Sequence, residues 1–238
     1  MTAEIQDMRN QQLPNYPTLR QLIMVRHSEA EKTQRQVHGG PGTHLTDRGR
    51  TDTVDLARYL SERELVGHDS VVFCGPRQQT LETAEILAHQ INLHWSVLEG
   101  LRNINMGIFD GLTDDEARAT DPDSMARLES WRRGELPVGK ICIPRSENLE
   151  SFVTRIDNTL EEMISVSSTP LVIVTRSVGI ALHNLLGDSF RWNFDHYARI
   201  RLDPGSVTVY SRNKNPSNQY VLSNSTEYLD GSREFADD

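Results

Sequence analysis

The chain has 238 residues, 37% of them hydrophobic and 25% charged, which is typical of a globular domain that buries a core without disulfide staples. Its formal net charge of −9 argues against nucleic acids and anionic membrane surfaces as general partners. Its two cysteines lie outside any paired motif, its start shows no signal sequence, and no apolar run approaches the ~20 residues of a membrane span, so we expect a cytoplasmic protein.

Strands and helices are predicted to alternate along the chain. A polar lead-in over residues 1–19 is expected to be flexible, and the acidic tail 231–238 likewise. Between them the residues predict, in order, a strand at 21–25, a glycine-rich polar loop, a helix opening at 45–50, a strand at 71–74, a helix at 80–91, a strand at 93–98, a cap insertion at about 101–145, a helix at 149–164, a strand at 171–175, a helix at 177–186, and strands at 207–210 and 220–222.

This alternation predicts a single α/β domain over residues 20–230, a three-layer α/β/α sandwich with a mostly parallel central sheet. The run Leu171-Val172-Ile173-Val174 shows no alternation with polar residues, as expected for a strand that helices cover on both faces. The cap segment has few strand signals and several charged helical stretches, so we expect it to lie over one edge of the sheet.

Two of the predicted strands end in an arginine followed by a polar residue. Arg26-His27-Ser28 follows the strand at 21–25, and Arg176-Ser177 follows the strand at 171–175. Ligands of open α/β sheets bind at the carboxyl ends of the strands. We therefore expect both strand ends to contribute to one site.

The motifs of the chain resemble those of the histidine phosphatase superfamily, which includes the cofactor-dependent phosphoglycerate mutases. The resemblance spans roughly residues 21–229. It is carried by Met24–Glu29, Leu45–Gly49, Gly75-Pro76 through Leu87, Leu101-Arg102 with Gly107–Thr113, Val172–Thr175, and Arg201–Asp203 leading to Ser206–Val209.

The resemblance implies the phosphoglycerate-mutase-like fold and phosphoryl transfer through a phosphohistidine. His27 matches the nucleophile and Arg26 the cation before it. A neutral imidazole attacks phosphorus, so such a site needs positive charge for the phosphate. The family supplies two arginines, a second histidine, and a carboxylic acid that protonates the leaving oxygen.

Most of the remaining family positions are substituted in this chain. Ser28 replaces a glycine, Thr33 a substrate-contacting asparagine, Gln79 the second arginine (the nearest arginine is Arg77), Asn103 the acid, Arg176 the second histidine, and Ser177 a further glycine. An asparagine cannot donate a proton as an acid. An arginine at position 176 adds a fixed charge that grips phosphate or carboxylate.

These residues predict an anion-binding site with Arg26, His27 and Arg176 as catalytic residues. Substrate binding is assigned to Ser28, Thr33, Arg77, Gln79, Asn103 and Ser177. The alternatives are an ion pair of Arg176 with Glu29 or Glu147, a plain turn at Asn103, and a solvent-facing Arg77. His38 and His44 border the site on their loop.

Three functions stay open at this point. The first is an atypical enzyme acting on a small anionic metabolite, phosphorylated or carboxylated, without standard phosphohistidine turnover. The second is a slow or specialised phosphatase with His27 as nucleophile, and the third is a non-catalytic anion- or partner-binding protein. The histidine spacing predicts no metal site. No cofactor, nucleic acid or membrane is expected, and a homodimer stays open.

Overall fold

The core of the protein is a six-stranded sheet in the order β3-β2-β4-β1-β5-β6. The computed structural model describes residues 16, 18–35, 37–186, 200–212 and 218–229. The first four strands of that order are parallel to one another, and β5 is antiparallel to both of its neighbours, β1 and β6. The strands are β1 (Gln21–Arg26), β2 (Val72–Cys74), β3 (Trp95–Val97), β4 (Leu171–Val174), β5 (Val207–Arg212) and β6 (Asn218–Ser225).

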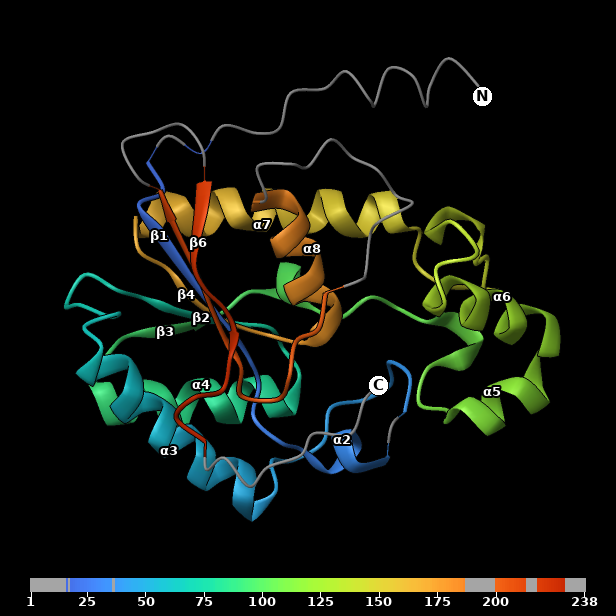
Figure 1. The fold of residues 1–238 in the computed structure, drawn as a ribbon, viewed down its shortest axis with the longest axis horizontal. Coiled ribbons are helices and arrows are strands. Elements are labelled where there is room, and N and C mark those ends of the chain that lie inside the picture. Colours follow the sequence, from blue (N-terminus) through green and yellow to red (C-terminus); the bar gives the residue numbers. More distant parts are fainter. Residues whose placement is uncertain (1–15, 17, 36, 187–199, 213–217, 230–238) are drawn as a thin grey trace.

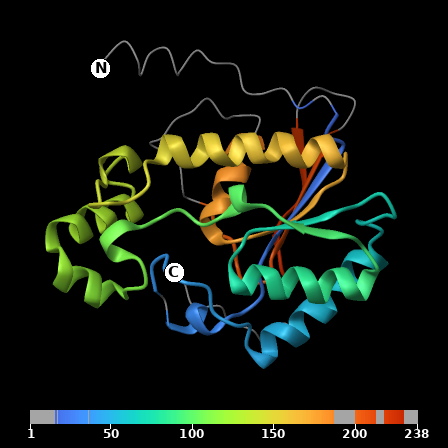
Figure 2. The same cartoon turned by 180° about the vertical axis from the view of Figure 1, so that it is seen from behind.

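Helices cover both faces of the sheet, so the expected three-layer α/β sandwich is confirmed (Figures 1 and 2). Helices α7 (Leu149–Val166) and α8 (Arg176–Leu186) lie on one face, and α3 (Asp47–Glu62) and α4 (Gln78–Ile91) on the other. A short helix, α2 (Glu31–Arg35), follows β1. The sequence predicted a continuous loop there, and that prediction was wrong: the five residues of α2 are too few to show helical periodicity.

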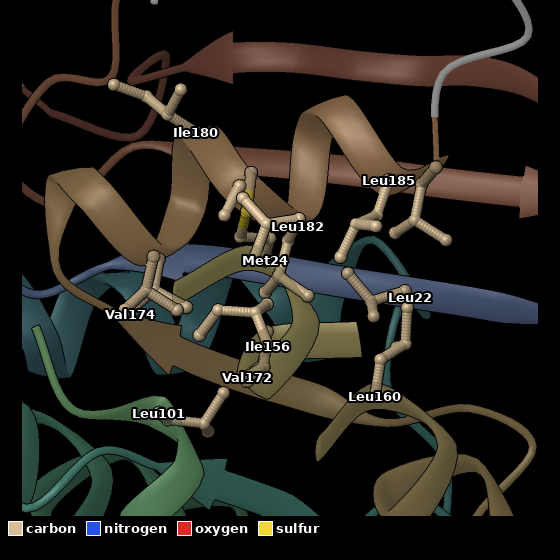
Figure 3. Packing of buried hydrophobic residues seen from close by; sticks show 14 of the residues in the cluster. Leu22, Met24, Leu101, Ile156, Leu160, Val172, Val174, Ile180, Leu182 and Leu185 are labelled. Atoms are coloured by element: carbon tan, nitrogen blue, oxygen red, sulfur yellow. The ribbon is translucent and has the colours of Figure 1, made fainter. Parts of the chain in front are cut away.

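The alternation of side chains along β1 explains the two cores. Successive residues of a strand point to opposite faces, so Leu22 and Met24 pack with α7 and α8, while Ile23 and Val25 pack with α3 and α4. Figure 3 shows the first of these cores, where side chains of β1 and β4 meet those of both covering helices. Complete burial of one such aliphatic side chain contributes about 1.5–3 kcal/mol.

The cap segment lies beside the sheet (Figure 1), and a smaller cluster of buried side chains holds it together. The cap segment contains the 3₁₀ turn η2 (Gly107–Phe109) and the helices α5 (Asp114–Thr120) and α6 (Pro122–Arg132). Both short helices begin at a capped N-terminus. Thr113 forms a capping box at α5, and the Asp121 carboxylate caps α6. Further 3₁₀ turns are η1 (Glu99–Leu101) and η3 (Val138–Lys140). The cluster itself is built from Phe109, Ala117, Met125, Leu128 and Ile143.

The described part of the expected lead-in packs on the domain. Leu19 is buried in the core, and the Tyr16 hydroxyl donates to Asp157 on α7. The rest of residues 1–19 and the tail 231–238 lie outside the described residues. Cys74 and Cys142 are unpaired, and burial raises the pKa of the Cys74 thiol to about 12. None of the helices described here is long and apolar enough to cross a membrane.

Candidate functional site

The carboxyl ends of β1 and β4 lie side by side, as the sequence predicted. The strands are parallel, and Arg26 is opposite Val174 in the ladder. The backbone N–H of His27 donates to the Val174 carbonyl at 3.0 Å, which extends the pairing by one residue. Arg26-His27-Ser28 and Thr175-Arg176-Ser177 therefore leave the sheet at the same edge.

His27 is held in one tautomer by its own backbone neighbourhood. The side chain is 4% exposed, and its Nδ1 lies 2.8 Å from the Ser28 carbonyl oxygen. Because a carbonyl only accepts, Nδ1 carries the proton and Nε2 keeps its lone pair. Burial, together with the charge of Arg26, lowers the pKa of His27 to about 3. The imidazole is therefore neutral at neutral pH, the state that a nucleophile or base requires.

The two arginines of the predicted catalytic set differ in their surroundings. Arg26 is nearly buried, and its Nη1 donates to the Leu202 carbonyl, which fixes the guanidinium at the sheet edge. Arg176 is the first residue of α8 and is exposed. Glu147, one of its alternative partners, is paired with Arg155 and Arg102. Anion contact by Arg26 and Arg176 stays a prediction.

Asn103 lies directly against the β4 end. Its Oδ1 accepts the Thr175 hydroxyl at 2.9 Å and also the Ser177 hydroxyl. The backbone N–H of Ile104 donates to the same Ser177 oxygen at 3.4 Å. Asn103 and Ser177 are thus brought together by contact, and the carboxamide oxygen is used as an acceptor.

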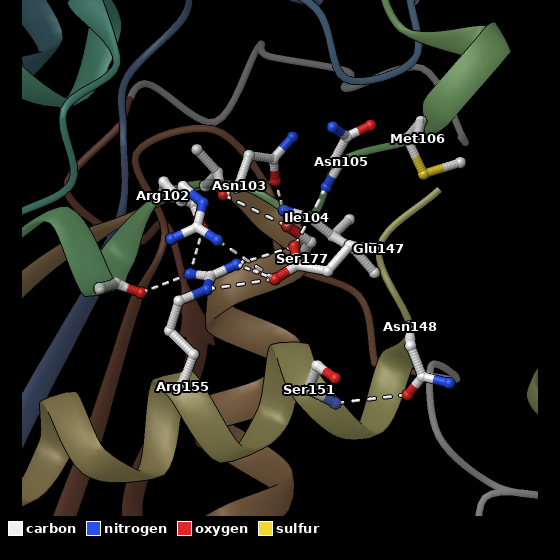
Figure 4. Close-up of polar contacts among 12 residues, drawn as sticks. Arg102, Asn103, Ile104, Asn105, Met106, Glu147, Asn148, Ser151, Arg155 and Ser177 are labelled. Atoms are coloured by element: carbon white, nitrogen blue, oxygen red, sulfur yellow. Dashed lines mark hydrogen bonds and ion pairs between the residues drawn. The ribbon is translucent and has the colours of Figure 1, made fainter. Parts of the chain in front are cut away.

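The segment that carries Asn103 is held in place from α7 (Figure 4). Arg155 donates to both Glu147 carboxylate oxygens, each at 2.8 Å from its Nη2. Its Nη1 also donates to the Gly100 carbonyl, and to that of Arg102 at 3.0 Å. The Asn105 N–H donates to Glu147 at 3.3 Å. This clamp fixes the backbone on both sides of Asn103.

The other predicted substrate-binding residues make contacts within the protein. The Ser28 hydroxyl accepts from Thr53 on α3 at 2.8 Å. The Thr33 hydroxyl accepts from the Ala30 N–H at 3.4 Å, at the start of α2. Their role toward a ligand stays a prediction, because these bonds neither require nor exclude one.

Gln79 and Arg77 stand at the start of α4. Gln79 is 1% exposed, and its Oε1 accepts from the Thr43 N–H at 3.3 Å. Arg77 is the half-buried N-cap residue of α4, with no side-chain cap bond. After burial, the positive charge of Arg77 is the next cause of the lowered pKa of Lys32 on α2. The Arg77 guanidinium therefore lies within electrostatic reach of the Lys32 ammonium.

Lys32 is a cation of this region that the sequence analysis did not single out. Its Nζ donates to the Gly39 carbonyl, and its charge contributes to the lowered pKa of His27. The available signal was its place just after Arg26-His27, one residue before Thr33. That signal is weak, because the sequence does not show that residues 31–35 form a helix.

His38 and His44, on the loop that borders the site, bond to carboxylates of the cap and of α4. His38 Nε2 lies 2.7 Å from Asp114 Oδ1 on the cap, and Asp114 also pairs with Arg132. His44 Nδ1 bonds to Glu82 on α4. Within the described ranges, no three histidine, cysteine or acidic side chains gather into a metal-binding group.

Proteins of similar sequence include an acid phosphatase and phosphoglycerate-mutase-like proteins. Over 133 residues the chain is 32% identical to an acid phosphatase of Mycobacterium tuberculosis, covering 56% of this chain and 61% of that protein. It is 24% identical over 171 residues to an Arabidopsis thaliana 6-phosphofructo-2-kinase/fructose-2,6-bisphosphatase, covering 72% of this chain and 22% of that one. The chain thus spans less than two thirds of either relative.

Solved structures share the fold at low identity. One, described as a putative α-ribazole-5′-phosphate phosphatase of Escherichia coli, superposes with a TM-score of 0.71 at 16% identity, covering 87% of this chain and 97% of that one. A mycobacterial glucosyl-3-phosphoglycerate phosphatase solved with inorganic phosphate gives a TM-score of 0.70 at 20% identity, with 89% and 100% covered. A family model matches residues 22–225. On this match and the fold it accompanies, the chain belongs to the histidine phosphatase superfamily, branch 1.

Proposed function

We propose that the chain is an atypical enzyme of this superfamily that acts on a small anionic metabolite, phosphorylated or carboxylated, by chemistry other than standard phosphohistidine turnover. The observation that supports this most is the state of Asn103. Its carboxamide oxygen accepts hydrogen bonds from the Thr175 and Ser177 hydroxyls, at the position that the resemblance assigns to the family acid. A cytoplasmic location belongs to the same proposal.

Phosphohistidine turnover requires a proton for the oxygen that leaves phosphorus. A carboxamide has no acidic proton to give, and loss of a general acid costs on the order of 10²–10⁴ in rate. Asp110, one candidate replacement on the cap side, accepts hydrogen bonds at its Oδ1 from the backbone N–H groups of Gly40 and Met106, at 3.1 and 3.0 Å. The second histidine, which Arg176 replaces, is not regained either.

The roles in this proposal follow the chemistry of each side chain. Arg26 and Arg176 hold the anion, since a guanidinium grips phosphate and carboxylate in bidentate fashion. His27 Nε2 acts on the substrate as base or nucleophile. Gln79 and Asn103, which are neutral, orient the substrate.

A specialised phosphatase is the second candidate, and the tautomer of His27 favours it. With Nδ1–H bonded to the Ser28 carbonyl, Nε2 is ready to attack phosphorus. In that case a residue other than Asn103 has to protonate the leaving group.

Product analysis separates these functions. Wild type, His27→Ala and Arg176→Ala are incubated with a panel of small phosphorylated and carboxylated metabolites, followed by mass spectrometry and a phosphate assay. Arg133→Ala is the control, because Arg133 is exposed and pairs with Glu135 beside α6. The proposal expects conversion without phosphate release, lost in the first two variants only.

Phosphate release that is lost in His27→Ala would instead establish the phosphatase. Binding of a metabolite with no conversion by wild type would overturn both and leave a binding protein.

A further inference from the structure

Lys32 is tied to Gln79 by two consecutive hydrogen bonds. The Lys32 N–H donates to the Thr43 hydroxyl at 3.0 Å, and the Thr43 N–H donates to Gln79 Oε1 at 3.3 Å. The neighbouring Gly42 is packed tightly on α4, since a Cβ there would lie 2.5 Å from the Gln78 nitrogen. The α2 turn therefore lies next to the position that carries an arginine in the family.

The charges that face Lys32 are those of the site. Burial, together with the like charges of Arg77 and Arg26, lowers the pKa of Lys32 to about 8, while Asp110 acts in the opposite direction. Lys32 in turn depresses the pKa of His27. Lys32 is repelled by the like charges of Arg77 and Arg26, and a bound anion relieves that repulsion.

We propose that Lys32 binds the anionic group of the ligand and supplies the positive charge that an arginine at position 79 would provide. An ammonium has three N–H donors, and the contact with the Gly39 carbonyl uses one of them. The positive charge thus comes from Lys32 on α2, and not from an arginine at position 79 on α4. This inference rests on the proposed anion-binding function and assigns a new residue to it.

Titration calorimetry with inorganic phosphate tests this assignment. Wild type is compared with Lys32→Gln and with the double variant Lys32→Gln/Gln79→Arg, and Lys140→Gln, at an exposed lysine on η3, is the control. A hydrogen bond to a charged group contributes enough that Lys32→Gln should weaken phosphate binding by about 10- to 100-fold. The double variant should recover most of this loss, and the control should bind like wild type.

The outcomes separate this inference from the function it rests on. If wild type binds phosphate and Lys32→Gln binds it equally well, Lys32 is overturned and the anion site stands. If Lys32→Gln loses binding and arginine at position 79 does not restore it, the shared role of the two positions is overturned. Absence of phosphate binding by wild type overturns the role of Lys32 and the phosphorylated substrate class together, while the carboxylated class is decided by the product analysis described above.

A pH series gives a second readout that does not depend on a substitution folding well. Sulfate keeps its charge across the range, so a fall in sulfate affinity of wild type above about pH 8 reports loss of the Lys32 proton. Lys32→Arg should bind sulfate without that fall. A wild-type affinity that stays constant through about pH 9.5 would contradict the assignment.

Discussion

Reinstating the acid at position 103 should create phosphatase activity. We consider Asn103→Glu in an Arg176→His background, which introduces at the β4 end the two residues that the proposal expects there in an ordinary family member. A positioned general acid contributes on the order of 10²–10⁴ in rate. The matched control is Asn103→Gln in the same background, because glutamine has the size of glutamate without its proton.

The contacts of Asn103 set where in that range the gain falls. Its oxygen accepts hydrogen bonds from Thr175 at 2.9 Å and from Ser177, and a glutamate carboxylate would accept the same two hydrogen bonds. Such bonds favour the ionised form, so they lower the pKa of the acid and reduce its protonated fraction. We therefore expect a gain near the lower limit, about 100-fold over the glutamine control.

Removing one donor should raise the gain further. Ser177→Gly takes one hydroxyl away, and a pKa rise of about one unit increases the protonated fraction about tenfold at pH 7. The assay is phosphate release from small phosphomonoesters by proteins with confirmed cooperative unfolding. If the folded glutamate variant releases phosphate no faster than the glutamine control, the geometry of the β4 end differs from our reasoning.

Three further substitutions test the supports of the site. Arg155→Met should lower the free energy of unfolding in urea, toward the lower end of roughly 3–5 kcal/mol, because it leaves the mostly buried Glu147 carboxylate with only the longer pair to Arg102, at 3.5 Å. Arg58→Met, at an exposed pair, should cost at most about 1 kcal/mol, and equal losses would contradict this. Gly39→Ala should cost about 1–3 kcal/mol and weaken phosphate binding, since φ is +38° and a Cβ would lie 1.8 Å from Asp110 Oδ1; wild-type stability would refute it. The pKa of His27 falls from 6.5 to about 3 on folding, so its contribution to stability is present above about pH 6.5 and is lost as the pH falls toward 3. Urea unfolding of His27→Gln should vary less than wild type across that window, and an unchanged slope would count against a buried neutral imidazole.

Much of the fold follows from local pattern. The apolar runs at 21–25 and 171–175 are buried on both faces in a parallel sheet, so their sequence shows the strands and their ends directly. Strand β3 is shorter than predicted, Trp95–Val97 in place of 93–98, and lies exposed at the sheet edge. An edge strand has one neighbour only, which leaves its length less constrained by its residues.

The partners within the site could not be predicted in the same way. Asn103 bonds to Ser177 across 74 positions of the chain, and the sequence placed both in the site without indicating that they touch. The backbone of Lys32 is linked to Gln79 because the loop after α2 returns through Thr43 to the start of α4. Such contacts depend on how loops close over the sheet, and neither periodicity nor composition encodes that closure.

The most direct test of the central claim is phosphate release from a broad panel of small phosphomonoesters, measured for wild type and His27→Ala under conditions in which wild type binds inorganic phosphate. The account predicts that the two proteins release phosphate at the same background rate, because Asn103 cannot protonate a leaving oxygen. Release by wild type that disappears in His27→Ala would contradict it and establish ordinary phosphohistidine turnover.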